Sequence, residues 1–237
     1  GDTLAALIEA MHTYYNSVYR ELPGRLVGQP NGNYLEHIGE LVARVSRISE
    51  PFLQDFVRRE VAGTGRRRIL ELGCGSAAHM RTAAQANHEL GGVGLEIDQA
   101  VVTQAQANLE QWGLNERFRV IRGDIRRSPA ELVGPFDAVT LYNLVYYFPV
   151  EERQGLFASL RRLLAPGGVV ALANNVQSRG RDAMAANLDV ATRSMAGCWP
   201  LPDLRELENQ LRAAGFTSTS RTQLMLGSAY YGITARC

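Results

Sequence analysis

Two glycines hold positions at which a chain can approach a ligand closely. They lie in Gly73-x-Gly75-x-x-Ala78, directly after an apolar run that ends at Leu72 and directly before a helical pattern. Glycine lets the backbone of a strand-to-helix turn come close to a ligand, and the N–H groups at the start of the helix favour a polar or negative group. Taken alone, this glycine spacing does not identify the ligand, because it also satisfies the dinucleotide-binding fingerprint.

Acidic side chains follow the next two apolar runs. Glu96 lies at the end of GVGLEI, and Asp124 lies in the turn after FRVI. A carboxylate at the first position can accept hydrogen bonds from the two vicinal hydroxyls of a ribose, and one at the second can accept from an exocyclic amine. Ile97 and Ile125 can then pack on the faces of a purine. The spacing predicts three neighbouring strand ends that offer an amino-acid-sized pocket, a ribose site and an adenine site.

The elements that must position these residues alternate along the chain. The apolar patterns predict strands at 67–72, 92–97, 117–121, 136–141 and 168–173, and helices at 77–90, 99–112, near 129–133 and at 150–163. This alternation is typical of a mostly parallel sheet with right-handed crossovers. A helix is expected at 203–214, and two last strands at 216–221 and 229–235 are too close for a crossover. They must form an antiparallel hairpin.

Segments outside this alternation are expected to cover the ligand site. Helical spacing predicts three helices at 3–20, 34–47 and 51–61, and the pattern breaks again at 175–202, where 181–195 is helical. An insertion after the carboxyl end of a strand lies over the ligand crevice. We therefore expect a helical cap at 1–65 and a core domain at 66–237, with 175–202 as a lid.

The composition narrows the class of protein. The chain has 237 residues, 46% of them hydrophobic and 21% charged, with a net charge of +1. These values disfavour a nucleic-acid or membrane partner, and no apolar run approaches the ~18 residues of a membrane span. The three cysteines show no metal-ligand spacing, which favours reduced thiols and a cytoplasmic location. The chain begins at Gly1 instead of a methionine, so a preceding partner domain is an expectation.

Five motifs between about residues 67 and 175 together resemble those of class I S-adenosylmethionine-dependent methyltransferases of the small-molecule type. They read ILELGCGSA, GVGLEID, IRGDI, FDAVTLYNLVYYF and LLAPGG, in the order and at the spacing of that family. One departure is Ala77, where the family often has a third glycine. The resemblance implies an α/β, Rossmann-like three-layer αβα fold. Its seven-stranded, mostly parallel sheet would end in an antiparallel hairpin, with a helical cap at the N-terminus.

The resemblance also assigns roles to residues, with S-adenosylmethionine as the cofactor. Nine residues would line the methionine end, bind the adenosine or lie beside the transferred methyl group. They are Glu71, Gly73, Gly75, Glu96, Ile97, Asp124, Ile125, Tyr142 and Asn143. The cap and the segment after the fourth strand would bind the acceptor through Tyr14, Tyr19, Tyr146, Tyr147 and Trp199. His12 and Tyr15 are the catalytic candidates, and His37 is a further candidate base or metal ligand.

The expected function is methyl transfer to a small molecule, free or tethered to a carrier, plausibly in secondary metabolism. Catalysis would come mainly from positioning for in-line displacement. The fourth strand is not followed by the Asn/Asp-Pro-Pro-Tyr box that similar nucleic-acid base methyltransferases usually carry, which disfavours a nucleic-acid substrate. No histidine lies beyond residue 88, which weakens the analogy with plant-type phenol methylation. The alternatives are a non-catalytic cofactor-binding module and an NAD-dependent oxidoreductase. The oxidoreductase is less well supported, because Glu71 would repel the pyrophosphate of a dinucleotide.

Overall fold

A seven-stranded sheet forms the centre of the computed structural model, which describes residues 2–34, 39–63, 65–127, 132–178 and 182–237. The strand order is β3-β2-β1-β4-β5-β7-β6. Six of these seven strands run in one direction, and β7 runs antiparallel to its two neighbours, β5 and β6. The strands are β1 (Arg68–Leu72), β2 (Gly91–Glu96), β3 (Phe118–Arg122), β4 (Phe136–Tyr142), β5 (Leu164–Asn175), β6 (Ser218–Gln223) and β7 (Tyr230–Arg236). The predicted sheet and its terminal hairpin are confirmed.

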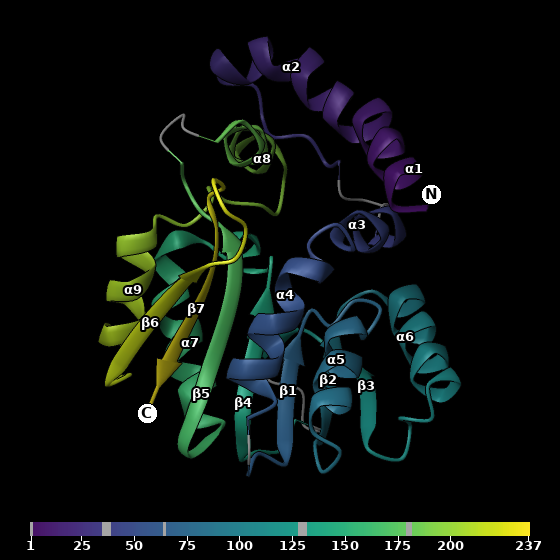
Figure 1. Ribbon diagram of the computed structural model, residues 1–237. Coiled ribbons are helices and arrows are strands. Elements are labelled where there is room, and N and C mark those ends of the chain that lie inside the picture. The colour runs from purple at the N-terminus through teal and green to yellow at the C-terminus, as the bar shows by residue number, and fades with distance from the viewer. Residues whose placement is uncertain (1, 35–38, 64, 128–131, 179–181) are drawn as a thin grey trace.

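Helices cover both faces of this sheet (Figure 1). They are α1 (Asp2–Ala10), α2 (Asn16–Leu26), α3 (Gly39–Ser46), α4 (Glu50–Phe56), α5 (Ala78–Ala86), α6 (Gln99–Gln111), α7 (Arg153–Arg162), α8 (Ala183–Ser194) and α9 (Leu204–Ala213). Two π-helical turns, Met11–Tyr15 and Val57–Val61, continue α1 and α4. The structure therefore has the predicted αβα layers.

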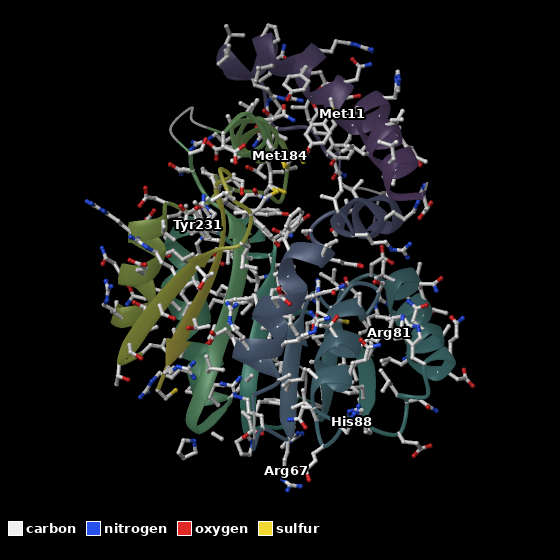
Figure 2. The ribbon with its side chains drawn as sticks, in the orientation of Figure 1. Met11, Arg67, Arg81, His88, Met184 and Tyr231 are labelled. Atoms are coloured by element: carbon white, nitrogen blue, oxygen red, sulfur yellow. The ribbon has the colours of Figure 1, made fainter. Side chains whose placement is uncertain are left out.

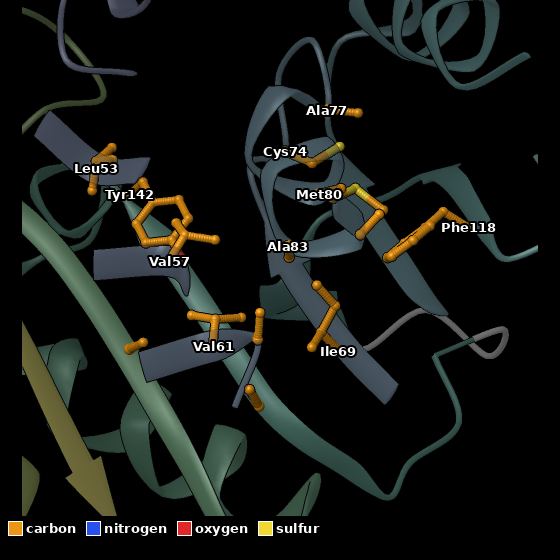
Figure 3. Close-up of a cluster of buried hydrophobic side chains, with 14 of the residues drawn as sticks. Leu53, Val57, Val61, Ile69, Cys74, Ala77, Met80, Ala83, Phe118 and Tyr142 are labelled. Carbon is orange, nitrogen blue, oxygen red and sulfur yellow. The ribbon is translucent and has the colours of Figure 1, made fainter. Parts of the chain in front are cut away.

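The period-two alternation of the strands separates two hydrophobic layers. Ile69 packs with α4, α5 and α6 on one face, whereas Leu70 and Leu72 pack with α7 and α9 on the other. Figure 3 shows the first layer, in which Leu53 of α4 lies near Tyr142 of β4 and Met80 of α5 lies between Tyr142 and Phe118 of β3. Because both faces of β1 and β4 are buried, these central strands read as nearly continuous apolar runs.

Several boundaries differ from the sequence expectation. β5 begins at Leu164, before Pro166-Gly167, because Leu164 pairs with Phe136 across a register shift in β4. α5 ends at Ala86, since Asn87 has an extended backbone. The helix expected near 129–133 and His37 fall largely or wholly outside the described residues.

The cap lies over the end of the sheet at which β1 and β2 finish (Figure 1). Its α1–α2 helix continues through the turn Met11–Tyr15, and its following loop joins the segment after α8. Gly32 forms an isolated bridge with Met195, through hydrogen bonds of 3.1 Å to Ser194 and 2.8 Å from Ala196. The division into a cap at 1–65, a core at 66–237 and a lid at 175–202 stays a prediction. Within the described residues, none of the helices combines the length and apolarity needed to cross a bilayer.

Candidate functional site

The turn after β1 has a backbone that requires glycine. Gly73 and Gly75 have φ angles of +60° and +50°. A Cβ atom at Gly73 would lie 2.8 Å from Cδ1 of Leu144, whereas one at Gly75 would meet no heavy atom within 4 Å. The N–H of Gly73 donates to the carbonyl of Leu95 at 2.8 Å, which attaches the turn to β2. The turn therefore offers open space directly before α5.

Glu96 links the end of β2 to this turn. Its Oε2 accepts from the N–H of Gly75 at 3.1 Å, and its Oε1 accepts from the N–H groups of Ile97 and Asp98 at 2.8 and 3.2 Å. Asp98 itself caps α6 by accepting from the N–H groups of the first turn. Backbone donors thus hold the Glu96 carboxylate in place beside the open space at Gly75.

Asp124 lies in the turn after β3 and is held by Arg126. The carboxylate accepts from the backbone N–H of Arg126 at 3.0 Å and from its guanidinium at 2.8–3.0 Å. Burial raises the pKa of Asp124, but the hydrogen bonds and charge of Arg126 outweigh burial and lower it overall. Asp124 is therefore an ionised acceptor at neutral pH.

A cavity of about 430 Å³ joins these two carboxylates at the point where β1 lies between β2 and β4. In an open α/β sheet, ligands bind at such a switch point, beyond the carboxyl ends of the strands. Its lining includes the glycine turn, the ends of β2, β3 and β4, and residues from the cap and the segment after α8, namely Val42, Ser46, Gly73, Gly75, Glu96, Ile97, Asp98, Asp124, Ile125, Arg126, Tyr142, Asn143, Leu144, Tyr147, Phe148 and Gly197.

Glu71 lies behind this cavity and does not line it. The residue is only 2% exposed, and its neighbours include Cys74 and Tyr142. Burial raises the pKa of Glu71 to about 8. Glu96 and Asp124 therefore share one cavity as the spacing predicted, but Glu71 belongs to the layer beneath it.

Tyr142 and Asn143 separate the main cavity from a small one of about 70 Å³ that also borders Gly73, Gly75 and His79. Asn143 has a φ of +51°, and its Nδ2 donates to the hydroxyls of Ser49 and Tyr230 at 3.4 Å. Among the residues that the structure describes, the Asn143 Oδ1 and the Tyr142 hydroxyl are buried and have no hydrogen-bond partner. Burial of this kind is costly, so both atoms are expected to bond to a ligand or to water.

His79 lies against the other side of Tyr142. The two rings meet edge to face with their centroids 4.8 Å apart. Burial lowers the pKa of His79 to about 4, so its imidazole is neutral at physiological pH.

Some of the residues predicted to bind the acceptor lie together beside the cavity. Tyr14, Tyr15, Tyr146 and Tyr147, which we name the tyrosine cluster, pack near Cys198 beside the cavity, and Tyr147 lines it. Trp199 is half-buried, and its backbone N–H donates to the backbone carbonyl of Tyr146 at 2.8 Å. Tyr19 is 39% exposed and stands apart from the cavity lining.

The two catalytic candidates of the cap point different ways. Tyr15 is 9% exposed and belongs to the tyrosine cluster. His12 is exposed in the same π-helical turn and does not line the cavity. His88 lies at the opposite end of the sheet from the cap (Figure 2). Within the described ranges, no histidine lines the main cavity.

A family model matches this part of the chain. Residues 69–168 match the family described as a methyltransferase domain, and they span β1 to the start of β5 with both carboxylates of the cavity. This segment is a methyltransferase domain. The predicted class I S-adenosylmethionine-dependent methyltransferase fold is confirmed, and S-adenosylmethionine is the cofactor of this family.

The methyltransferase domain is similar to proteins with different acceptors. The chain is 33% identical over 153 residues to the ribosomal protein L11 methyltransferase of Thermus thermophilus, covering 62% of this chain and 52% of that protein. It spans about half or less of the length of the curated relatives that it matches. These relatives support the fold and the enzyme class.

Two solved structures resemble almost the whole chain. The mitomycin 7-O-methyltransferase has a TM-score of 0.82 at 13% identity, and the match covers 99% of this chain and 71% of that chain. An O-methyltransferase from neocarzinostatin biosynthesis, in complex with S-adenosylmethionine and 2-hydroxy-5-methyl naphthoic acid, has a TM-score of 0.73 at 17% identity. That match covers 93% of this chain and 68% of that chain. At these identities the likeness shows a shared fold, and it extends over the cap as well as the methyltransferase domain.

Some lining residues of the methyltransferase domain and its cap were missed by sequence reasoning. Arg126 follows Asp124 by two positions, and this spacing could have suggested a pair. Val42, Ser46 and Gly197 carry no local signal, because they reach the cavity only through the packing of the cap and of the segment after α8.

Proposed function

We propose that this chain transfers a methyl group from S-adenosylmethionine to an oxygen atom of a small molecule. The observation that carries the proposal is the single cavity that brings Glu96 and Asp124 together beside an aromatic wall. The family match and the fold of two small-molecule O-methyltransferases support it.

The residues of the cavity suit each part of the cofactor. Glu96 would accept from the ribose hydroxyls and Asp124 from the adenine amine, with Ile97 and Ile125 against the purine. Ile97 is 58% exposed without a ligand and lines the cavity, so a purine would cover it. These roles require the adenosine to extend along the ends of β2 and β3.

The methionine end would lie at the glycine turn. Gly73 and Gly75 border both cavities, and the unpartnered Asn143 Oδ1 and Tyr142 hydroxyl lie between them. An amide oxygen suits an ammonium group, and a phenol suits a carboxylate. When bound, the cofactor supplies an electrophilic methyl group on a sulfonium. Glu71 lies beneath this end, and its predicted place along the methionine end would require the cofactor to reach past Tyr142.

The acceptor would enter between the cap and the segment after α8. Tyr14, Tyr146, Tyr147 and Trp199 provide aromatic faces there, which suit a planar molecule. Positioning such an acceptor against the methyl group would supply most of the acceleration. The mitomycin 7-O-methyltransferase and the O-methyltransferase from neocarzinostatin biosynthesis support a role in secondary metabolism.

The open cavity also supports the enzyme over a non-catalytic binding module. A module that had lost its reaction would have no need of an aromatic wall beside the methyl position. The methyltransferase match supports this function over the NAD-dependent oxidoreductase.

Calorimetry with S-adenosylmethionine and with its demethylated product tests the proposal. Replacing Glu96 by alanine removes two charged hydrogen bonds to ribose, and we expect a loss of about 3 kcal/mol, or roughly 150-fold in Kd. Glu110→Ala, on the exposed face of α6, is the matched control and should leave Kd unchanged. Equal binding by the two variants would contradict the assignment of the ribose site.

A further inference from the structure

Asn143 follows β4 directly and has a backbone conformation that few residue types adopt. Its φ of +51° lies in the left-handed region, where asparagine is several-fold enriched among the residues other than glycine. Its backbone N–H donates to the carbonyl of Ala173 on β5 at 2.7 Å. Asn143 lines both the main cavity and the small one beside it. The sheet therefore fixes the backbone of Asn143 at the wall between the two cavities.

Two hydroxyl groups from distant segments hold the amide of this side chain. The Asn143 Nδ2 donates to the hydroxyl oxygen of Ser49 and to that of Tyr230, each at 3.4 Å. Ser49 directly precedes α4 in the cap, whereas Tyr230 begins β7 and is only 3% exposed. The amide is thus held between the cap and the terminal hairpin.

The hydrogen bonds of Ser49 determine which end of the amide can lie beside it. A serine hydroxyl has one proton, and Ser49 donates it to the carbonyl of Ser46 at 2.7 Å. The Ser49 oxygen can then only accept, so Asn143 must present its NH₂ group on this side. A reversed amide would place two acceptors, the Asn143 Oδ1 and the Ser49 Oγ, against each other. The Asn143 Oδ1 is therefore directed away from Ser49.

The groups around the small cavity favour a cation at this oxygen. Glu50 lines the small cavity, and the described lining residues include no lysine or arginine. Burial raises the pKa of Glu50, and the charge of Arg47 opposes that rise. His79 also lines the cavity and is neutral, as its lowered pKa requires. The cavity of about 70 Å³ has room for an ammonium group, which is about the size of one water molecule.

We propose that Ser49 and Tyr230 are positioning residues, which hold the Asn143 amide so that its oxygen accepts from the ammonium group of the cofactor. This inference rests on the proposed function and adds the two residues that set the direction of one of its contacts. Because Ser49 lies in the cap, the contact is complete only when the cap is seated on the sheet. The cap would therefore contribute to cofactor affinity as well as to the acceptor site.

Calorimetry with three ligands tests the direction of the amide. They are S-adenosylhomocysteine, its decarboxylated analogue S-adenosyl-3-thiopropylamine, which keeps the ammonium group, and 5′-methylthioadenosine, which has neither charged group. Ser49→Ala and Tyr230→Phe should each weaken binding of the first two ligands about fivefold, because an amide that can rotate presents its oxygen for only part of the time. Binding of 5′-methylthioadenosine should not change.

Each variant has a matched control. Ser49→Thr keeps a hydroxyl group at this position and should restore the affinity that Ser49→Ala loses. Tyr231→Phe changes the next residue of β7, which borders a separate groove and neither of the two cavities. It should bind all three ligands like the wild type.

A double-variant cycle separates positioning from a structural role. Asn143→Gly removes the amide, and glycine suits the left-handed backbone. In the Asn143→Gly background, Ser49→Ala and Tyr230→Phe should change the Kd for S-adenosylhomocysteine by less than about twofold, because the group that they position is gone. A hydroxyl that only stabilises the fold would weaken binding in both backgrounds.

The outcomes separate this inference from the proposed function. If the wild type does not bind S-adenosylhomocysteine, the proposed function fails first. If it binds, and Ser49→Ala and Tyr230→Phe bind equally well, the positioning role is overturned and the methyltransferase remains. A loss for S-adenosylhomocysteine alone would mean that the NH₂ group faces the cofactor's carboxylate, and an equal loss for 5′-methylthioadenosine would mean a structural role. Either result also overturns the inference.

Discussion

Replacing Gly75 by alanine tests where the cofactor lies. The residue has a φ of +50°, and no heavy atom lies within 4 Å of the Cβ position. A left-handed backbone costs an L-residue about 1–2 kcal/mol, while alanine stabilises by about 0.4–1 kcal/mol through the unfolded chain. The free energy of unfolding should therefore fall by about 1 kcal/mol, which lowers Tm by roughly 2–4 °C.

Cofactor affinity should fall much further than stability. Gly75 borders both cavities, so its new methyl group would occupy space that the methionine end needs. Overfilling a packed site costs about 1–3 kcal/mol, and we expect Kd for S-adenosylhomocysteine to rise roughly 30-fold in calorimetry.

Gly113→Ala is the matched control for the effect of the left-handed backbone on the free energy of unfolding. Gly113 has a φ of +65° and open space around its Cβ position, but it borders neither cavity. It should lose similar stability in calorimetric unfolding and keep its affinity. If Gly75→Ala and Gly113→Ala bind the product equally well, the cofactor does not approach the glycine turn, and the reasoning is refuted.

Three further substitutions test charge and structure. Glu71→Gln should flatten the pH dependence of unfolding in urea. A carboxyl whose pKa rises from 4.5 to about 8 on folding makes the protein less stable as the pH rises between these values. The control Glu110→Gln, at an exposed position, should leave the dependence of the unfolding free energy on pH unchanged. Arg126→Ala should raise the pKa of Asp124. When the pH is lowered, Asp124 of the variant should therefore take up its proton earlier, and product affinity should begin to fall at a higher pH than in the wild type. Asp137→Ala removes the acceptor of two backbone N–H groups at the start of β1 and should lower the free energy of unfolding by about 2 kcal/mol, with unchanged product affinity.

The sheet and two of its three acidic positions could be predicted from sequence because both depend on local patterns. Apolar runs of strand length, separated by helical spacing, are sufficient to predict parallel pairing. Once the strands are parallel neighbours, Glu96 and Asp124 must lie at the same edge. Their shared cavity follows from strand order and needs no knowledge of side-chain packing.

Glu71 shows where the same reasoning stopped short. The family resemblance assigned it to the methionine end of the cofactor, but side chains on a strand alternate between faces. Glu71 shares a face with Ile69, which packs beneath α4 and α5, and this period could have indicated burial. Glu71 is a buried carboxyl under the site, beside Tyr142, and its contact with the cofactor stays a prediction.

The exposed position of His12 could also have been inferred from the period of its helix. The buried positions Ala6, Ala10 and Val18 define the inner face of the cap helix, and His12 lies away from them. Helical spacing alone could have placed His12 outside. It could not have placed both Tyr14 and Tyr15 inside, because the π-helical turn that carries them has no recognised sequence signal.

The acceptor site depends on contacts between segments that no local pattern relates. The bridge between Gly32 and Met195 attaches the cap loop to the end of α8, and the N–H of Trp199 attaches the next segment to the carbonyl of Tyr146. Cys198, between these two attachments, interacts with tyrosines from both the cap and the turn after β4. The cofactor end of the site is therefore set by strand order, whereas the acceptor end is set by how the cap packs on α8. We expect changes in that packing to alter the acceptor while leaving the five sequence motifs intact, so the motifs predict the cofactor but not the substrate.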